Sequence, residues 1–169
     1  MDEAKFITLD NCLTILIYTD RSKSTNHMEL FTFYGGNYSS YIDYNDKKRN
    51  IKEGSAHLLE HYVCENTVSG DLLDNLRKYN VLSCNAGTSA FNTSYFFNTV
   101  CNFYECLDTF LDGIYNVSFT NEKLNKTKYA VLNEIRDSQN NEGRRIADIR
   151  DRTLFSNCMD NLGSEDSIN

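Results

Sequence analysis

Hydrophobic and polar residues alternate in several stretches of the chain, a pattern typical of β-strands. The segments that show it are 6–18, 28–34, 81–88 and 92–100. In the first of them, Leu13, Ile15 and Ile17 share one face, and we expect the whole segment to be extended. Gly35 and Gly36 end the second segment. The polar segment that follows, 37–50, is predicted to be a loop.

Apolar residues that recur every three to four positions predict helices in other parts of the chain. The predicted helices are 53–64, 71–79, 103–117 and a long one that follows Thr120 and runs through Leu132 and Ile135 toward Leu154. Thr120 is a favourable N-cap for the long helix, and Glu122 suits its first turn. Strands and helices do not alternate regularly, so we expect an α+β domain with helices on one face of a mostly antiparallel sheet.

Composition and charge narrow the classes of function. The 169 residues correspond to one domain, and their net charge of −7 argues against a nucleic-acid partner, which would need clustered Lys and Arg. Apolar runs are too short for a membrane span, and the N-terminal residues lack the apolar core of a signal peptide. We therefore expect a cytoplasmic protein, whose six cysteines are reduced thiols rather than a disulfide framework.

Two of the three histidines lie in one pentapeptide, His57-Leu-Leu-Glu60-His61. On a helix, His57 and His61 are one turn apart on the same face, about 6 Å along the axis. Two imidazoles so placed can bind a single Zn²⁺, and Glu60 lies on the flank of that face, where it can reach a water molecule without being a ligand. This is the inverted zincin order, H-x-x-E-H.

A catalytic zinc ion needs a third protein ligand and one open position. Glu134 is a candidate, because apolar neighbours within the predicted long helix favour a partly buried position for it. A glutamate on a helix is more often a solvated surface residue, and the pattern alone does not distinguish Glu134 from the other glutamates.

Four segments together resemble the pitrilysin/insulinase family of zinc metallopeptidases, which includes the mitochondrial processing peptidase. The segments are Gly54–His61, Asn85–Ser89, Val131–Ile135 and Leu162–Ile168. They occur in the order and register of the family and extend over nearly the whole chain. The ordered set is therefore more specific than the pentapeptide by itself.

The resemblance implies a zinc-dependent metalloendopeptidase with His57, His61 and Glu134 as zinc ligands. It assigns Glu60 as the general base that accepts a proton from the zinc-activated water and hands it to the leaving amine. The implied substrate is a peptide or small protein.

The same resemblance implies how the substrate binds. Asn85 and Ala86 are expected on an edge strand, against which an extended peptide pairs by β-augmentation. Family enzymes close two homologous domains around the peptide. We therefore interpret residues 1–169 as a single N-terminal zinc-binding domain that is truncated at its C-terminus, with the second domain absent and supplied by a further domain or a partner subunit.

Three positions depart from the family pattern. A glutamate commonly precedes the distal zinc ligand by seven residues, and Thr127 occupies that position here. Asn66 and Asn80 replace glycines, and asparagine is the residue that best tolerates the left-handed conformation after glycine.

Two alternatives stay open. The first is a non-catalytic or half-enzyme partner subunit of a heterodimeric peptidase. The second is a metal enzyme similar to S-ribosylhomocysteine lyase, which shares the motif but uses a cysteine ligand in a C-G context followed by a histidine. None of the cysteines here precedes a glycine, and no histidine follows His61, so this alternative has less support.

Overall fold

The computed structural model describes residues 3–155 and 161–169. The chain has an α+β fold. The strands are β1 (Glu3–Thr8), β2 (Thr14–Thr19), β3 (Asn26–Thr32), β4 (Ser40–Ile42), β5 (Lys48–Asn50), β6 (Ser83–Thr88) and β7 (Thr93–Thr99). The helices are α1 (Ser55–Glu65), α2 (Leu72–Arg77), α3 (Phe103–Tyr115), α4 (Asn121–Gln139), α5 (Glu142–Leu154) and α6 (Glu165–Ile168). Within the described ranges, no helix has both the length and the hydropathy to cross a membrane.

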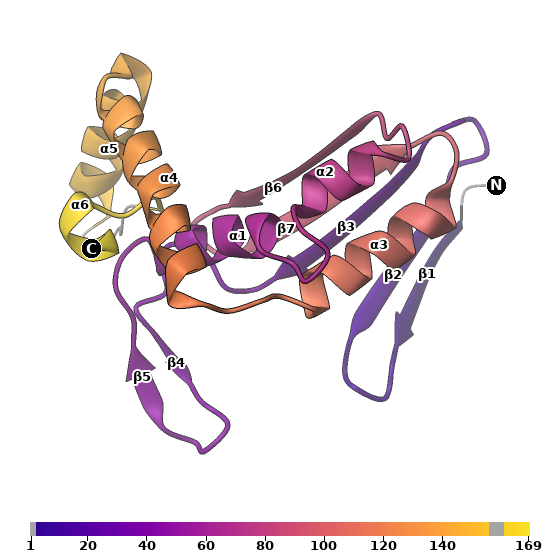
Figure 1. Cartoon of the computed structure of the whole chain (residues 1–169), viewed down its shortest axis with the longest axis horizontal. Coiled ribbons are helices and arrows are strands. Elements are labelled where there is room, and N and C mark those ends of the chain that lie inside the picture. The colour runs from indigo at the N-terminus through magenta and orange to yellow at the C-terminus, as the bar shows by residue number, and fades with distance from the viewer. Residues whose placement is uncertain (1–2, 156–160) are drawn as a thin grey trace.

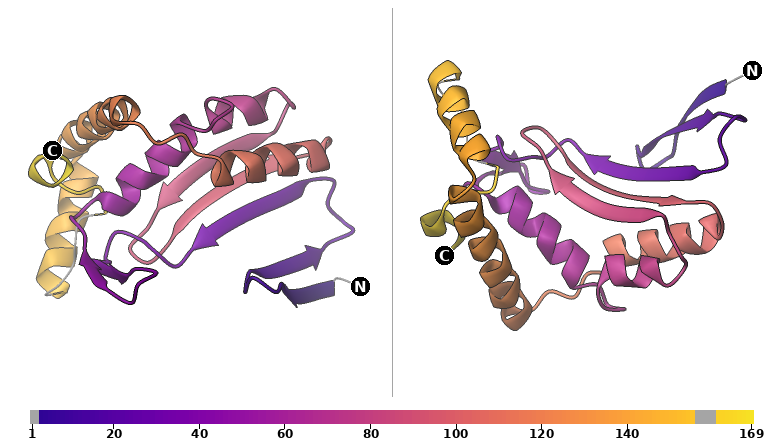
Figure 2. Two further views of the ribbon diagram at one scale, coloured as in Figure 1. Left: turned by 60° about the horizontal axis from the view of Figure 1, so that its bottom comes forward. Right: turned by 90° about the horizontal axis from the view of Figure 1, so that it is seen from above.

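The central sheet is antiparallel and has the order β3-β7-β6. Tyr95 of β7 pairs with Leu30 of β3 on one side and with Ala86 of β6 on the other. Helices α1, α2 and α3 lie on one face of this sheet, and α4, α5 and α6 gather at one end (Figures 1 and 2). The predicted fold class, a mostly antiparallel sheet with helices on one face, is confirmed.

The main hydrophobic core lies between the sheet and the first three helices. Alternate residues of β7 are buried, which places one face of the central strand against the helices. The buried members of this core are Val63, Cys64, Leu72, Leu76, Tyr95, Phe97, Cys106 and Phe110. The prediction that the cysteines are reduced core thiols holds for Cys64 and Cys106, whereas Cys84 is half-buried and Cys12 and Cys101 are exposed free thiols. Cys158 lies outside the described residues.

A second, smaller core joins α4 to the C-terminal segment. Its buried members are Val131, Leu132, Ile135, Leu162 and Ile168. Leu58 of α1 packs against this core from the side. Helix α1 thus contacts both cores, and its position is fixed from two directions.

The expectation of one extended segment over 6–18 is wrong. The segment is a hairpin in which β1 and β2 pair along their whole length, from Glu3 opposite Thr19 to Thr8 opposite Thr14. Between the strands, Cys12 adopts a positive φ of 68° and the side chain of Asn11 accepts a hydrogen bond from the Leu13 amide. Asparagine can make such a turn without glycine or proline, and the sequence interpretation overlooked it.

The predicted loop 37–50 also contains a hairpin, formed by β4 and β5. The side chain of Asp43 accepts hydrogen bonds from the amides of Asn45 and Lys47 and from the guanidinium of Arg49. The hairpin projects from the molecule (Figure 1). Because β5 is exposed along its length, no apolar face marks it in the sequence.

The predicted long helix is two helices. Helix α4 ends at Gln139, and α5 starts after Asn141, whose side chain caps it by accepting a hydrogen bond from the Arg144 amide. The N-cap predicted at Thr120 is confirmed, because its hydroxyl accepts from the Lys123 amide.

The two asparagines that replace family glycines behave differently. Asn80 adopts the left-handed conformation, with φ of 57°, as expected. Asn66 does not, because its φ is −128°. Its buried side chain instead donates hydrogen bonds to the Tyr62 carbonyl and to the Thr127 hydroxyl.

Candidate metal centre

Helix α1 presents His57 and His61 on one face, as their spacing predicts. Their rings meet edge to face, with centroids 4.7 Å apart. The two Nε2 atoms are 3.2 Å apart. The His57 side chain is buried, at 7% exposed, whereas that of His61 is 27% exposed.

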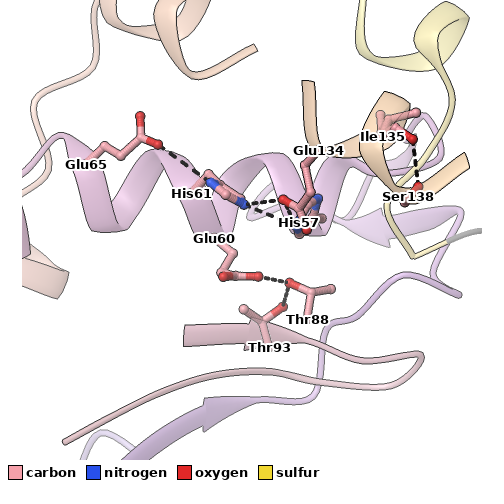
Figure 3. A network of polar contacts seen from close by, with 9 residues as sticks. All are labelled: His57, Glu60, His61, Glu65, Thr88, Thr93, Glu134, Ile135 and Ser138. Carbon is pink, nitrogen blue, oxygen red and sulfur yellow. Dashed lines mark hydrogen bonds and ion pairs between the residues drawn. The ribbon is translucent and has the colours of Figure 1, made fainter. Parts of the chain in front are cut away.

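Glu134 of α4 completes the group. Its Oε2 atom is 3.1 Å from Nε2 of His61 and 3.4 Å from Nε2 of His57. Figure 3 shows the Glu134 side chain directed at the two rings from the neighbouring helix. Within residues 3–155 and 161–169, this is the one group of three or more His, Cys, Asp or Glu side chains close enough to hold a metal ion.

The donor atoms have the spacing that a zinc ion requires. Bond lengths of about 2.0–2.1 Å around a tetrahedral Zn²⁺ place neighbouring ligand atoms about 3.3–3.4 Å apart. The three measured separations are 3.2, 3.1 and 3.4 Å. Two imidazoles and one carboxylate therefore fit zinc in both chemistry and spacing, and such a set of three would leave one coordination position to a non-protein ligand.

Glu60 lies beside this group and points from α1 toward the sheet (Figure 3). It is 7% exposed, and its Oε2 accepts a hydrogen bond of 2.8 Å from the Thr88 hydroxyl of β6. Burial raises the pKa of the Glu60 carboxyl above its ordinary value, while Thr88 and His61 act in the opposite direction. A carboxyl group with a raised pKa is better suited to accept a proton near neutral pH.

Hydroxyl groups continue from Glu60 into the sheet. The Thr88 hydroxyl is 3.4 Å from that of Thr93, which donates to the Tyr34 carbonyl at 2.9 Å. Thr93 is buried, so this row of polar groups is held within the fold. It fixes the side of α1 on which the Glu60 carboxylate lies.

Glu65 is a residue near the site that the sequence analysis did not identify. Its Oε1 lies 3.6 Å from Nδ1 of His61, and its Oε2 accepts a 3.0 Å hydrogen bond from the hydroxyl of Thr127. Thr127 is completely buried. The spacing of four positions between His61 and Glu65 could have identified the first contact, whereas the second joins two helices and has no local signal.

Asn85 and Ala86, the predicted substrate-binding residues, lie on β6. Within the described parts of the chain this strand pairs only with β7, so it forms an edge of the sheet. Asn85 is exposed, and Ala86 packs partly against the main core. The structure therefore places both residues on an edge strand, next to the strand end that holds Thr88.

Two solved structures share this fold over 99% of the chain. One is described as an M16-like peptidase from Alicyclobacillus acidocaldarius, with a TM-score of 0.88 and 21% identity. The other is pitrilysin, with a TM-score of 0.76 and 18% identity. The chain covers 40% of the first structure and 18% of the second.

The sequence itself matches known proteins. It is 25% identical over 139 residues to YmfH of Bacillus subtilis, described as an uncharacterized zinc protease, and this match covers 82% of the chain and 32% of the relative. Residues 43–163, well over half of the chain, match the model of the insulinase family, peptidase family M16. The matched segment includes the two histidines, Glu60 and Glu134. The chain therefore belongs to the insulinase (M16) family of peptidases.

Proposed function

We propose that this chain is the metal-binding domain of a zinc metalloendopeptidase, with His57, His61 and Glu134 as the zinc ligands and Glu60 as the general base. The observation that carries the proposal is the convergence of three donor atoms from two helices at separations of 3.1–3.4 Å. A buried carboxyl group beside them, outside the donor set, supports the assignment of the base. The relative described as a zinc protease supports zinc as the metal.

Glu60 and Thr88 have different roles in the proposed peptide hydrolysis. When bound, Zn²⁺ activates a water molecule and polarises the scissile carbonyl. Glu60 accepts the proton of the attacking water and passes it to the leaving amine. Thr88 holds the carboxylate of Glu60 while it does so, because the hydroxyl donates to one of its oxygens.

Strand β6 is the proposed binding edge for the substrate. Its outer backbone groups, including those of Asn85 and Ala86, can pair with an extended peptide as an added strand. Such pairing depends on main-chain hydrogen bonds, so it accepts many sequences. The substrate class is therefore an extended peptide or an unfolded segment of a small protein.

We propose further that the peptide is enclosed by a second domain or a partner subunit. The chain spans 32% of its curated relative and 40% and 18% of the two structures it resembles. The presence of both ligand histidines and of Glu60 favours a catalytic domain over a non-catalytic partner. A cysteine-ligated lyase site has no support within the described residues, because the group that could hold a metal ion consists of His57, His61 and Glu134 and contains no cysteine.

Zinc content tests the ligand and base assignments. We expect stoichiometric zinc in the unmodified chain and in Glu60→Gln, and loss of zinc in His61→Ala and Glu134→Ala. His27→Ala is the matched control, because His27 is exposed on β3 and bonds to Asn98. Absence of zinc from the unmodified chain, or its retention in His61→Ala, would overturn the metal site.

Peptide cleavage tests the base. With a second domain or partner present, Glu60→Gln is expected to lose peptidase activity while it retains zinc, since it removes the proton acceptor and no ligand. Activity in Glu60→Gln equal to that of the unmodified protein would remove Glu60 from the mechanism and leave the metal site intact.

A further inference from the structure

We propose that Glu65 is a positioning residue that holds the His61 ring in the orientation and tautomer needed for metal binding, and that Thr127 and Asn66 hold Glu65 in place. This proposal rests on the proposed zinc site and deepens it. It assigns a function to a polar cluster on the side of His61 that faces away from Glu134 and His57.

The two ring nitrogens of His61 face different groups. Nε2 points to the donor set, 3.1 Å from Glu134 and 3.2 Å from His57. Nδ1 points the other way, 3.6 Å from Oε1 of Glu65 (Figure 3). A neutral imidazole that binds a metal through one nitrogen carries its proton on the other. The proton of metal-ligating His61 would therefore face the Glu65 carboxylate.

The separation of 3.6 Å between Nδ1 of His61 and Oε1 of Glu65 is slightly longer than a hydrogen bond. A side-chain movement of about 0.5 Å would form the bond. Both side chains are partly buried, at 27% and 26% exposed. An acceptor at this place favours the tautomer that leaves Nε2 free to bind a metal ion.

Glu65 is held from its other side by two buried residues. The Thr127 hydroxyl of α4 donates to Oε2 of Glu65 at 3.0 Å. The Asn66 amide donates to the oxygen of the same hydroxyl at 3.1 Å and to the Tyr62 carbonyl at 3.1 Å. Because Asn66 occupies the Thr127 oxygen as a donor, the hydroxyl proton is directed at Glu65. Donation thus runs from Asn66 through Thr127 to one oxygen of the Glu65 carboxylate, and the other carboxylate oxygen faces Nδ1 of His61 as an acceptor.

A purely structural role would be to join α1 to α4. The positions of the groups indicate more than that, since the carboxylate is aimed at the ring nitrogen opposite the donor set. A structural role would change stability and leave both metal affinity and the His61 tautomer unaffected. These three quantities separate the two roles.

The experiment compares zinc affinity, by competition with a chelating indicator, with the ring ¹⁵N shifts of His61 in the metal-free chain. The variants are Glu65→Ala, Thr127→Val and Thr127→Ser, and Glu105→Ala is the control because Glu105 is exposed on α3. We expect Glu65→Ala to weaken zinc binding about 10–100-fold and to lose the preference for the Nδ1–H tautomer. Thr127→Val should likewise weaken zinc binding and reduce the preference for the Nδ1–H tautomer. Thr127→Ser, which keeps the hydroxyl, should retain the zinc affinity and the tautomer preference of the unmodified chain.

The outcomes distinguish failure of the positioning role of Glu65 from failure of the proposed zinc site. Zinc affinity and His61 tautomer unchanged in Glu65→Ala, with only a lower melting temperature, would overturn the positioning role and leave the metal site standing. If the unmodified chain binds no zinc, the proposed metal site fails. The tautomer measurement in the metal-free chain then still decides whether Glu65 orients His61.

Discussion

Glu60 occupies a position that is unfavourable for a carboxyl group and useful for a base. It is 7% exposed, and the Thr88 hydroxyl gives it one hydrogen bond. Burial raises its pKa because the charged form loses water, and this is the largest influence on it. The raised pKa means that ionised Glu60 costs folding free energy, as residues placed for chemistry rather than stability often do.

The burial of Glu60 leads to a prediction about stability and pH in the metal-free chain. The folded-state pKa lies above the ordinary value of 4.5, so the native state binds the proton more tightly than the unfolded state. Stability therefore falls as pH rises from the unfolded pKa through the folded one. We expect Glu60→Gln, which removes the charge, to melt at a higher temperature than the unmodified chain at neutral pH. The difference should shrink below the ordinary pKa of glutamate.

Melting curves by circular dichroism at about pH 7 and about pH 4 measure this effect. Glu105→Gln is the control, since Glu105 is exposed on α3. A lower melting temperature of Glu60→Gln at neutral pH would contradict the prediction. It would mean that the ionised carboxylate contributes more to stability through Thr88 and His61 than it loses by burial.

At the scale of elements, the site depends on how α4 is attached to α1. The Tyr62 hydroxyl accepts a 2.9 Å hydrogen bond from the Thr120 amide and donates to the Ser118 carbonyl at 3.0 Å. Its ring stacks on Phe119, with centroids 5.0 Å apart and planes within 7°. Glu134 follows Thr120 by about four helical turns. Fixing the start of α4 against α1 therefore fixes where Glu134 meets the histidines.

Tyr62→Phe tests this attachment, because it keeps the stacked ring and removes the hydroxyl. The Thr120 amide and the Ser118 carbonyl each lose a partner near the 2% exposed Tyr62 side chain. We expect a loss of about 1–3 kcal/mol in the free energy of unfolding. Urea denaturation measures it, with Tyr129→Phe as control because Tyr129 is 71% exposed on α4. An equal stability of the two variants would show that the hydroxyl does not hold the helices together.

The elements differ in how far local sequence determined them. Helix α3 and the N-cap of α4 were predictable, because apolar periodicity and a capping threonine are local signals. In the hairpin over 3–19 the alternating pattern indicated extended chain, but the turn was missed because Asn11 and Cys12 make it without glycine or proline. The hairpin over 40–50 was missed because β5 is exposed and no buried face imposes a pattern on it. The break between α4 and α5 depends on the cap at Asn141, within a sequence whose apolar spacing continues on both sides.

In the candidate site, too, local sequence predicts some positions and not others. The positions of His57 and His61 relative to each other follow from helical spacing alone. Glu134 was identified by family resemblance, since its approach to α1 depends on packing between distant segments. The contacts of Glu60 with Thr88 and of Glu65 with Thr127 also join separate elements, so no pattern within either segment predicts them.

At the scale of the whole molecule, the candidate metal centre lies where two hydrophobic cores meet. Helix α1 contributes Val63 and Cys64 to the main core and Leu58 to the flank of the second. Helix α4 contributes Val131 and neighbouring residues to the second core. A metal ion bound by both helices would therefore connect the two cores, and its binding free energy would add to the stability of the whole fold.

Zinc should accordingly raise the melting temperature of the chain. A ligand that binds only the folded state adds about 2.7 kcal/mol at a free concentration of about 100 times its Kd. For a chain of this size, that corresponds to an increase of about 5–11 °C. Differential scanning calorimetry with buffered zinc measures the increase, and a chelator should reverse it. His61→Ala and Glu134→Ala should lose the response and His27→Ala should keep it, whereas an equal response in all of them would mean that zinc binds elsewhere.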